Sequence, residues 1–217
     1  MEPPSDLINA VRSRLEADAG LRWSSDIPMS VGLAGSSAIV IAALRAYGVD
    51  VPPLDLAHLA LSIERDDLGI VGGLQDRAVQ SFDAPVLVDG GDVTPLSPAR
   101  PLTFVVAWSP DAASHSGDYH SRVDPDRGAM DELASIARAA ARAFEGGSSD
   151  DLAELMDQSA RTRQRAAPLP DGHEALADAA RRAGFRPNSA GSGGAIVAVL
   201  EADPNEIGAP YVIESVR

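Results

Sequence analysis

The sequence predicts an α+β (or α/β) protein, because segments with helical and strand character are mixed along its 217 residues. The length corresponds to between one and two domains of about 150 residues each. A polar stretch rich in proline and glycine, residues 89–102, offers a boundary, so we expect domains at 1–95 and 96–217. Three glycine clusters lie at the expected junctions of strands and helices: Gly32–Gly35, Gly69–Gly73 and Gly191–Gly194.

The first half of the chain predicts four helices and one short strand. Ser5 is a suitable N-cap, and apolar residues at spacing four (Leu7, Val11 and Leu15) follow it, so the first helix should run to about Gly20. A short strand is expected next, and three further helices are separated by glycine turns. These later elements are expected at Leu21–Ile27, Ser36–Tyr47, Leu54–Arg65 and Leu74–Phe82.

The second half predicts strands at both ends of a helical region. A polar linker, Asp89–Pro101, separates the first two strands, and a long loop covers Ser109–Gly128. Long loops are uncommon in compact domains and are often functional. Strands are expected at Val86–Val88, Phe104–Trp108 and Ile196–Leu200, and helices at Met130–Phe144, Asp150–Arg165 and His173–Ala183.

The composition excludes several kinds of chemistry. The chain has no cysteine, which removes disulfides, thiolate metal sites and cysteine nucleophiles. All 18 basic residues are arginine, so a Walker-type phosphate loop and a Schiff-base lysine are absent. The formal net charge of −14 disfavours binding to nucleic acid. No apolar run reaches membrane-spanning length and no signal peptide is evident, so we expect a cytoplasmic protein.

Pro28–Ala38 has the composition of a phosphate-binding loop. Small residues lead directly into a helix, whose first amides lack internal partners and carry the positive end of the helix dipole. Glycines allow a phosphate to approach the backbone, and the two serine hydroxyls can bind phosphate or Mg²⁺. A glycine turn followed by an ordinary serine N-cap explains the same residues.

Two further glycine turns carry candidate chemistry. Asp76 follows Gly72 and Gly73 at a predicted helix start and is a candidate base, although a first-turn carboxylate also stabilises a helix dipole. Gly191–Gly194 precedes a strand and would let a phosphate or a second backbone approach closely, or form a simple tight turn.

Taken together, the three segments resemble the galactokinase, homoserine kinase, mevalonate kinase and phosphomevalonate kinase (GHMP) superfamily. Pro28–Ala38 is similar to its phosphate loop, and Gly191–Gly194 is similar to its last glycine motif. Gly69, Gly73 and Asp76 are similar to its catalytic segment. Within the superfamily, the sequences of these motifs are most similar to those of the glucuronokinase family, over about residues 25–200.

The resemblance implies ATP- and Mg²⁺-dependent phosphorylation of a sugar acid, with D-glucuronate at its anomeric hydroxyl as the first expectation. Asp76 would be the catalytic residue, and Ser37 and Glu64 the metal ligands. The implied ATP-binding residues are Pro28, Gly32, Leu33, Ala34, Gly35, Ser36, Ser37, Ala38, Gly191, Ser192 and Gly193. The implied substrate residues are Arg77, Ser116, Gly117, His120 and Arg122, with Arg161 and Arg163 as further candidates for the sugar carboxylate.

The family's first motif has no counterpart in this chain. We therefore expect a two-lobed GHMP-kinase-like α+β fold with an incomplete N-terminal lobe. Two alternatives stay open, namely a non-catalytic module that binds a nucleotide or a protein partner, and a GHMP kinase for another sugar or alcohol. A hydrolase triad or a metal site could be suggested by Ser114, His115, Ser116, His120 and Asp124, but nothing fixes their geometry and no nucleophile-elbow motif accompanies them.

Overall fold

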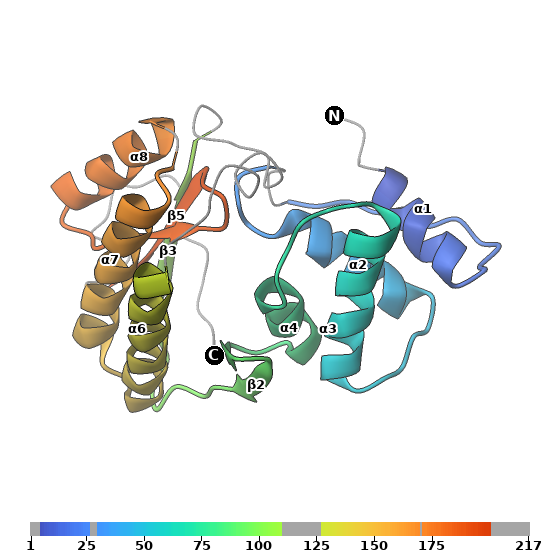
Figure 1. Cartoon of the computed structure of the whole chain (residues 1–217), viewed down its shortest axis with the longest axis horizontal. Coiled ribbons are helices and arrows are strands. Elements are labelled where there is room, and N and C mark those ends of the chain that lie inside the picture. Colours follow the sequence, from blue (N-terminus) through green and yellow to red (C-terminus); the bar gives the residue numbers. More distant parts are fainter. Residues whose placement is uncertain (1–4, 27–29, 110–126, 170, 201–217) are drawn as a thin grey trace. The chain divides into compact units, whose positions relative to one another are not determined.

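The structure is a computed structural model that describes residues 5–26, 30–109, 127–169 and 171–200 (Figure 1). The chain divides into two compact units. Unit 1 consists of Met1–Met29 and Ala34–Pro95, and unit 2 of Ser30–Leu33 and Leu96–Arg217. The four residues of the phosphate loop that precede Ala34 therefore belong to unit 2, although unit 1 surrounds them in the sequence.

Unit 1 is mainly helical. Pro53 occupies the first turn of α3, where its missing N–H costs nothing. A short π-helical segment, η1, continues α3 and contains Glu64. The helical elements are α1 (Ser5–Arg14), α2 (Gly35–Ala46), α3 (Pro53–Ser62), η1 (Ile63–Asp67) and α4 (Gln75–Phe82).

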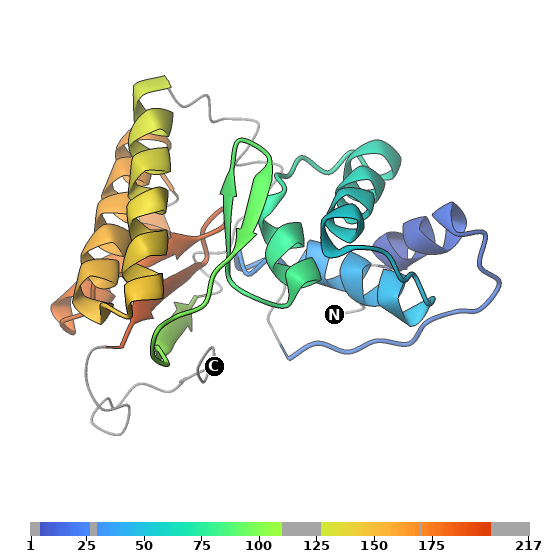
Figure 2. The same cartoon turned by 90° about the horizontal axis from the view of Figure 1, so that it is seen from below.

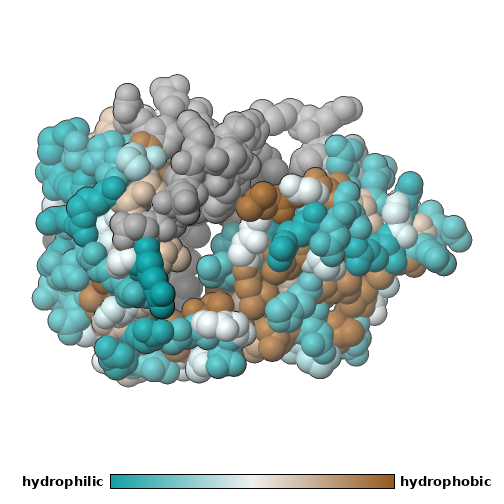
Figure 3. Space-filling model, viewed as in Figure 1, coloured by the Kyte–Doolittle hydropathy of each residue, from teal (hydrophilic) through white to brown (hydrophobic). Residues whose placement is uncertain are grey.

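The core of unit 1 forms where α1, α2 and the end of α3 meet. Val11 of α1, Val40 and Leu44 of α2, and Ile63 of η1 are all inaccessible to solvent. Burying each such side chain contributes about 1.5–3 kcal/mol. Helix α2 is rich in alanine and isoleucine and α3 in leucine and alanine, and apolar residues lie among the polar ones over these helices in Figure 3. The helix that carries the predicted phosphate loop is thus fixed by packing along its length.

A hairpin follows α4 where the sequence predicted a linker. Strand β1 (Val86–Asp89) pairs in antiparallel register with β2 (Asp92–Pro95). The two-residue turn is Gly90–Gly91, and both glycines have positive φ, which the tight hairpin turn requires. The expectation that Asp89–Pro101 is all linker is therefore wrong, and the Gly-Gly pair is the signal that identifies the turn.

Unit 2 is an antiparallel sheet covered by helices. The strands β3 (Phe104–Trp108), β5 (Ala195–Val199) and β4 (Asn188–Ala190) lie in the order β3–β5–β4. The helices α6 (Arg127–Gly146), α7 (Ser149–Ala166) and α8 (Asp171–Arg182) lie on one side of the sheet (Figure 2). Phe144, Leu152 and Val199 bury their side chains between helices and sheet. Ser148 caps α7, because its Oγ accepts from the N–H of Asp151.

The mixed helix and strand class is confirmed, and two further element predictions are wrong. The first helix ends at Arg14 rather than near Gly20, and Glu16 just beyond it has positive φ. Leu21–Asp26, the described part of the expected strand Leu21–Ile27, is not a strand. Strand β4 was not predicted. Most of the expected loop Ser109–Gly128 lies outside the described residues. Among the described helices, none combines the length and the apolar character that a membrane span needs.

Candidate active site

The described part of the phosphate loop has an unusual backbone. Ser30, Gly32 and Ala34 all have positive φ, at 63°, 79° and 57°. For the two residues with a side chain, this conformation costs about 1–2 kcal/mol each. Ala34 is left-handed and the next residue is helical, which is the arrangement that turns successive N–H groups toward one concavity. The loop is therefore shaped as an anion-binding turn.

No side chain caps α2, the helix that follows this turn. Its N-cap residue is Ala34, which has no side-chain acceptor for the amides of the first turn. The Oγ of Ser37 donates to the Ala34 carbonyl at 3.0 Å, and the N–H of Ala38 donates to the same oxygen at 3.1 Å. The Ala38 amide is thus used within the helix, whereas the positive end of the dipole at Gly35 and Ser36 has no side-chain acceptor as its cap.

Helix α4 is tied to this turn within unit 1. The Nε2 of Gln80 donates to the Ala34 carbonyl at 3.1 Å. Asp76, in the first turn of α4, lies four residues before Gln80 and therefore on the same face of the helix. Its carboxylate is half exposed. Gln80 was not predicted from the sequence as a site residue, although its spacing of four from Asp76 indicates that the two lie on the same helix face.

Glu64 and Arg77 form a buried ion pair. The Nε and Nη2 of Arg77 lie 2.8 and 2.7 Å from the Oε2 of Glu64, and the side chains are 4% and 0% exposed. The Nη1 of Arg77 also donates to the Gly73 carbonyl at 2.9 Å and lies 4.0 Å from the Oδ2 of Asp76. In this structure Arg77 therefore positions Glu64 and the glycine turn.

The predicted Mg²⁺ ligands are chemically suited to the ion. The Oε1 of Glu64 is buried and has no hydrogen-bond partner, so one carboxylate oxygen is left over after the ion pair is formed. Ser37 donates its hydroxyl hydrogen and keeps its lone pairs. No group of three or more histidine or acidic side chains suited to a metal occurs in the described ranges. A site with two protein oxygens fits Mg²⁺, which usually takes its remaining ligands from phosphate and water.

In unit 2 the start of the phosphate loop and the last glycine turn pack backbone against backbone. A Cβ on Gly32 would lie 2.5 Å from the Ala190 carbonyl oxygen, and one on Gly191 would lie 2.5 Å from the Gly32 carbonyl oxygen. A Cβ on Gly194 would lie 2.8 Å from the Cα of Val31. Such distances exclude any side chain at these positions. The structure therefore brings the start of the phosphate loop and the last glycine turn together, as close approach requires.

Two basic residues support the glycine turn from its other side. Arg163 of α7 donates from Nη1 to the Ser189 carbonyl at 2.9 Å and from Nη2 to the Gly191 carbonyl at 2.5 Å. His173 of α8 is 1% exposed. Its Nδ1 accepts from the Gly194 N–H at 3.3 Å, so its Nε2 carries the hydrogen and donates to the Ser189 Oγ at 2.9 Å.

The electrostatic environment keeps His173 neutral. Burial, together with the positive charges of Arg163 and Arg181, lowers the pKa of His173 from 6.5 to about 4. The neutral imidazole can therefore accept a hydrogen bond from Gly194 at neutral pH. The role of His173 was not predicted from the sequence, and Arg163 was expected only as a partner of the sugar carboxylate.

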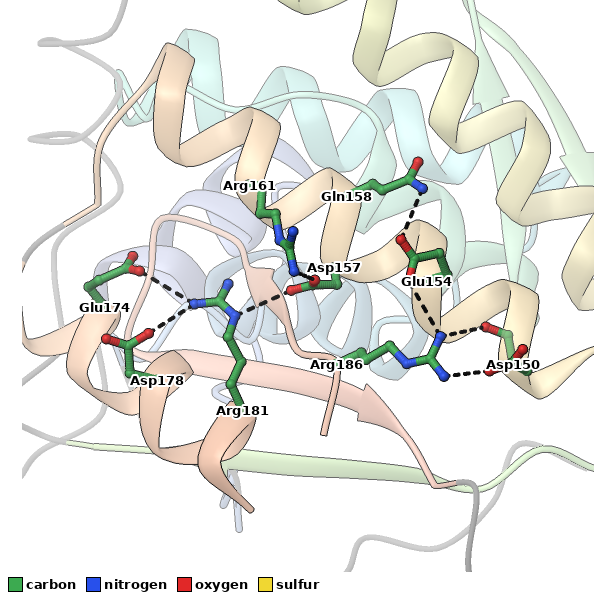
Figure 4. A network of polar contacts seen from close by, with 9 residues as sticks. All are labelled: Asp150, Glu154, Asp157, Gln158, Arg161, Glu174, Asp178, Arg181 and Arg186. Carbon is green, nitrogen blue, oxygen red and sulfur yellow. Dashed lines mark hydrogen bonds and ion pairs between the residues drawn. The ribbon is translucent and has the colours of Figure 1, made fainter. Parts of the chain in front are cut away.

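The remaining predicted site residues fall into three groups. Arg161 is exposed and pairs with Asp157 at 2.5 Å, in a polar network that joins α7 and α8 (Figure 4). Ser192 and Gly193 are buried in the glycine turn, whereas Leu33 is half-buried in the phosphate loop. Pro28, Ser116, Gly117, His120 and Arg122 lie outside the described residues.

A family model matches the N-terminal part of the chain. Residues 5–83, which include the phosphate loop, Glu64 and Asp76, match the model of the GHMP kinases N terminal domain. The resemblance predicted from the motifs is confirmed.

The curated proteins that are similar to this chain include two glucuronokinases. The chain is 32% identical to glucuronokinase 1 of Arabidopsis thaliana, over 88% of this chain and 60% of that protein. It is 30% identical to the probable glucuronokinase 2 of the same plant, over 86% and 58%. The chain thus spans about 60% of the length of these relatives.

Several solved kinase structures share this fold. Phosphomevalonate kinase of Streptococcus pneumoniae, in complex with phosphomevalonate and AMPPNP, matches with a TM-score of 0.73 at 15% identity, over 94% of this chain and 77% of that one. Lactococcus lactis galactokinase, complexed with galactose, matches with a TM-score of 0.67 at 18% identity, over 92% and 68%. The two-lobed GHMP-kinase fold is confirmed, and the chain covers part of it.

Proposed function

We propose that this chain is the nucleotide-binding and catalytic part of an ATP-dependent kinase that phosphorylates a sugar acid. The arrangement at Ala34 carries this proposal. Its carbonyl fixes α4 through Gln80, while the uncapped start of α2 faces an anion-binding turn. One packed unit thus contains both amides suited to phosphate and a half-exposed carboxylate, Asp76, suited to a hydroxyl.

Asp76 would act on the acceptor hydroxyl. It takes or orients the proton as the hydroxyl oxygen forms a bond to the γ-phosphorus, and the bond from that phosphorus to the bridging oxygen breaks to release ADP. The Nη1 of Arg77 lies 4.0 Å from the Oδ2 of Asp76, at the edge of ion-pair distance. Asp76 itself is accessible, which a base that meets a diffusing substrate requires.

The phosphate charge would be balanced without lysine. The amides at the start of α2 and the glycine-rich backbone bind the phosphate oxygens, and the helix dipole stabilises negative charge there. Ser37 and Glu64 would hold Mg²⁺, which neutralises charge on the phosphates when bound. Arg77 fixes Glu64 in position through two contacts with its Oε2. Positioning and charge neutralisation supply most of the catalysis in phosphoryl transfer.

A sugar acid, with D-glucuronate first, is the substrate that the glucuronokinase relatives support. Its carboxylate calls for an arginine fork. Arg77, Arg161 and Arg163 already bind groups of the protein itself, which leaves Arg122 as the candidate for that contact.

The test is ADP release with Mg²⁺ and ATP across four acceptors: D-glucuronate, D-galacturonate, galactose and mevalonate. We expect turnover with D-glucuronate, and a loss of about 10²–10⁴-fold in kcat for Asp76→Asn with ATP binding retained. Asp83→Asn is the matched control, because Asp83 is an exposed residue at the other end of α4 and asparagine tolerates its left-handed backbone.

The other outcomes identify the alternatives. Turnover with a neutral sugar or mevalonate alone indicates a different GHMP kinase. ATP binding without turnover on any acceptor favours a non-catalytic nucleotide-binding module. Asp76→Asn with unchanged turnover would remove Asp76 from the mechanism.

A further inference from the structure

The glycine turn Gly191–Gly194 is held from two opposite directions. On one side the absent side chains of Gly191 and Gly194 leave room for the backbone of Val31–Gly32. In addition, Arg163 binds the carbonyl of Gly191 and the carbonyl of Ser189 just before the turn, and His173 accepts from the last amide, that of Gly194. The turn is thus a layer between the phosphate loop and the helices α7 and α8.

The contacts of Arg163 and His173 are of a kind that fixes backbone shape. Arg163 holds two carbonyls that lie two residues apart, which a planar guanidinium does only when both point toward it. His173 binds the Gly194 amide and the Ser189 hydroxyl at opposite ring nitrogens, so it joins the end of β4 to the start of β5. Glycines at 191, 193 and 194, all with positive φ, have no conformational preference that would fix this shape alone.

We propose that His173 and Arg163 are positioning residues of the nucleotide site, which set the shape of the phosphate loop through the glycine turn. The turn packs directly on Val31–Gly32, and Gly32 and Leu33 are among the residues that the resemblance implies for ATP binding. This inference rests on the proposed function, because it assigns to ATP binding the consequence of the contacts that Arg163 and His173 make with the glycine turn.

The first experiment measures, without a ligand, how strongly His173 protects the amide of the glycine turn. Amide hydrogen exchange of Gly194 should be slow in the 217-residue chain, and about tenfold faster in His173→Leu, which removes the acceptor at nearly the same volume. His173→Asn should restore most of the protection, because its Oδ1 can replace Nδ1 as an acceptor. Equal protection of the Gly194 amide in all three proteins would show that His173 does not hold the glycine turn, and would overturn the inference.

The second experiment measures the consequence. His173→Leu and Arg163→Gln should raise the Kd and the KM for ATP about tenfold, the effect of one lost buried hydrogen bond, and leave the KM for the acceptor within twofold. His173→Asn should recover most of the ATP affinity, which a general loss of stability would not do. Arg182→Met is the control, because Arg182 is exposed in the last turn of α8.

The outcomes separate this inference from the proposed function. If the unaltered chain binds no ATP, the proposed function fails and this inference fails with it. If the unaltered chain binds ATP and both variants bind it equally well, only the inference is overturned. An equal rise in the KM for ATP and for the acceptor would also contradict it, because the turn would then act on the whole fold.

Discussion

Glu64 in unit 1 and His173 in unit 2 are both ionisable side chains that the fold buries almost completely, and the two regions bury them in opposite ways. Glu64 has a charged partner, since Arg77 binds its Oε2 through two nitrogens. His173 has no acidic partner among its hydrogen bonds, which go to a hydroxyl and an amide, and arginines lie nearby.

The difference shows what each region needs in order to bury such a group. A buried carboxylate needs a charged partner, and removal of that partner leaves an uncompensated charge. A buried imidazole surrounded by positive charge is stable in the neutral form and can accept a hydrogen bond. Unit 1 thus keeps one carboxylate oxygen that the ion pair does not use, and unit 2 presents a neutral acceptor to the backbone.

The largest effect is expected when the charged pair is broken. Arg77→Met leaves Glu64 buried without its partner and should lower the free energy of unfolding by about 3–5 kcal/mol. In a chain of this size the loss corresponds to a fall in Tm of about 6–20 °C. Thermal unfolding followed by circular dichroism measures it.

The double variant Glu64→Gln with Arg77→Met is the control for this pair. It removes both charges and should recover a large part of the lost stability, because no uncompensated charge remains buried. If the double variant is as unstable as Arg77→Met, packing around Arg77 rather than its charge explains the loss.

The second effect concerns the neutral histidine and is expected with pH. The pKa of His173 is about 4 in the folded state, against 6.5 for the free side chain, so the unfolded chain takes up a proton first as pH falls. Its contribution to stability is complete above pH 6.5 and is lost as pH falls from 6.5 to 4. The loss should be about 3 kcal/mol in total.

Urea unfolding at several pH values between 7 and 4 tests this dependence. His173→Asn has no group that titrates in this range, so the stability difference between the native chain and the variant should shrink as pH falls. A difference that stays constant with pH would mean that His173 is not buried in the neutral form.

The sequence predicted the parts of the site that depend on local backbone chemistry. The three glycine segments, the start of α2 and the place of Asp76 at the start of α4 follow from residue types that only certain turns and helix ends accept. The roles of Arg77, Arg163 and His173 could not be predicted, because each depends on a partner that lies 13 to 28 residues away in the sequence. Strand β4 was missed for a similar reason, since it is short and pairs only with β5.

The smallest effect is expected at a carboxylate that lies between the two extremes. The side chain of Asp157 is 5% exposed, but its partners Arg161 and Arg181 are 65% and 28% exposed and remain in contact with water (Figure 4). Asp157→Asn should therefore lower the free energy of unfolding by only about 1–3 kcal/mol. Asp178→Asn is the matched control, because Asp178 binds the same Arg181 at 3.1 Å with half of its side chain exposed, and we expect it to lose at most about 1 kcal/mol.

Urea unfolding at low salt and at 1 M salt measures both variants. Screening should reduce the effect of Asp178→Asn more than that of Asp157→Asn, since salt weakens exposed pairs first. Equal losses for the two variants would show that partner exposure, rather than burial of the carboxylate itself, determines the strength of these pairs.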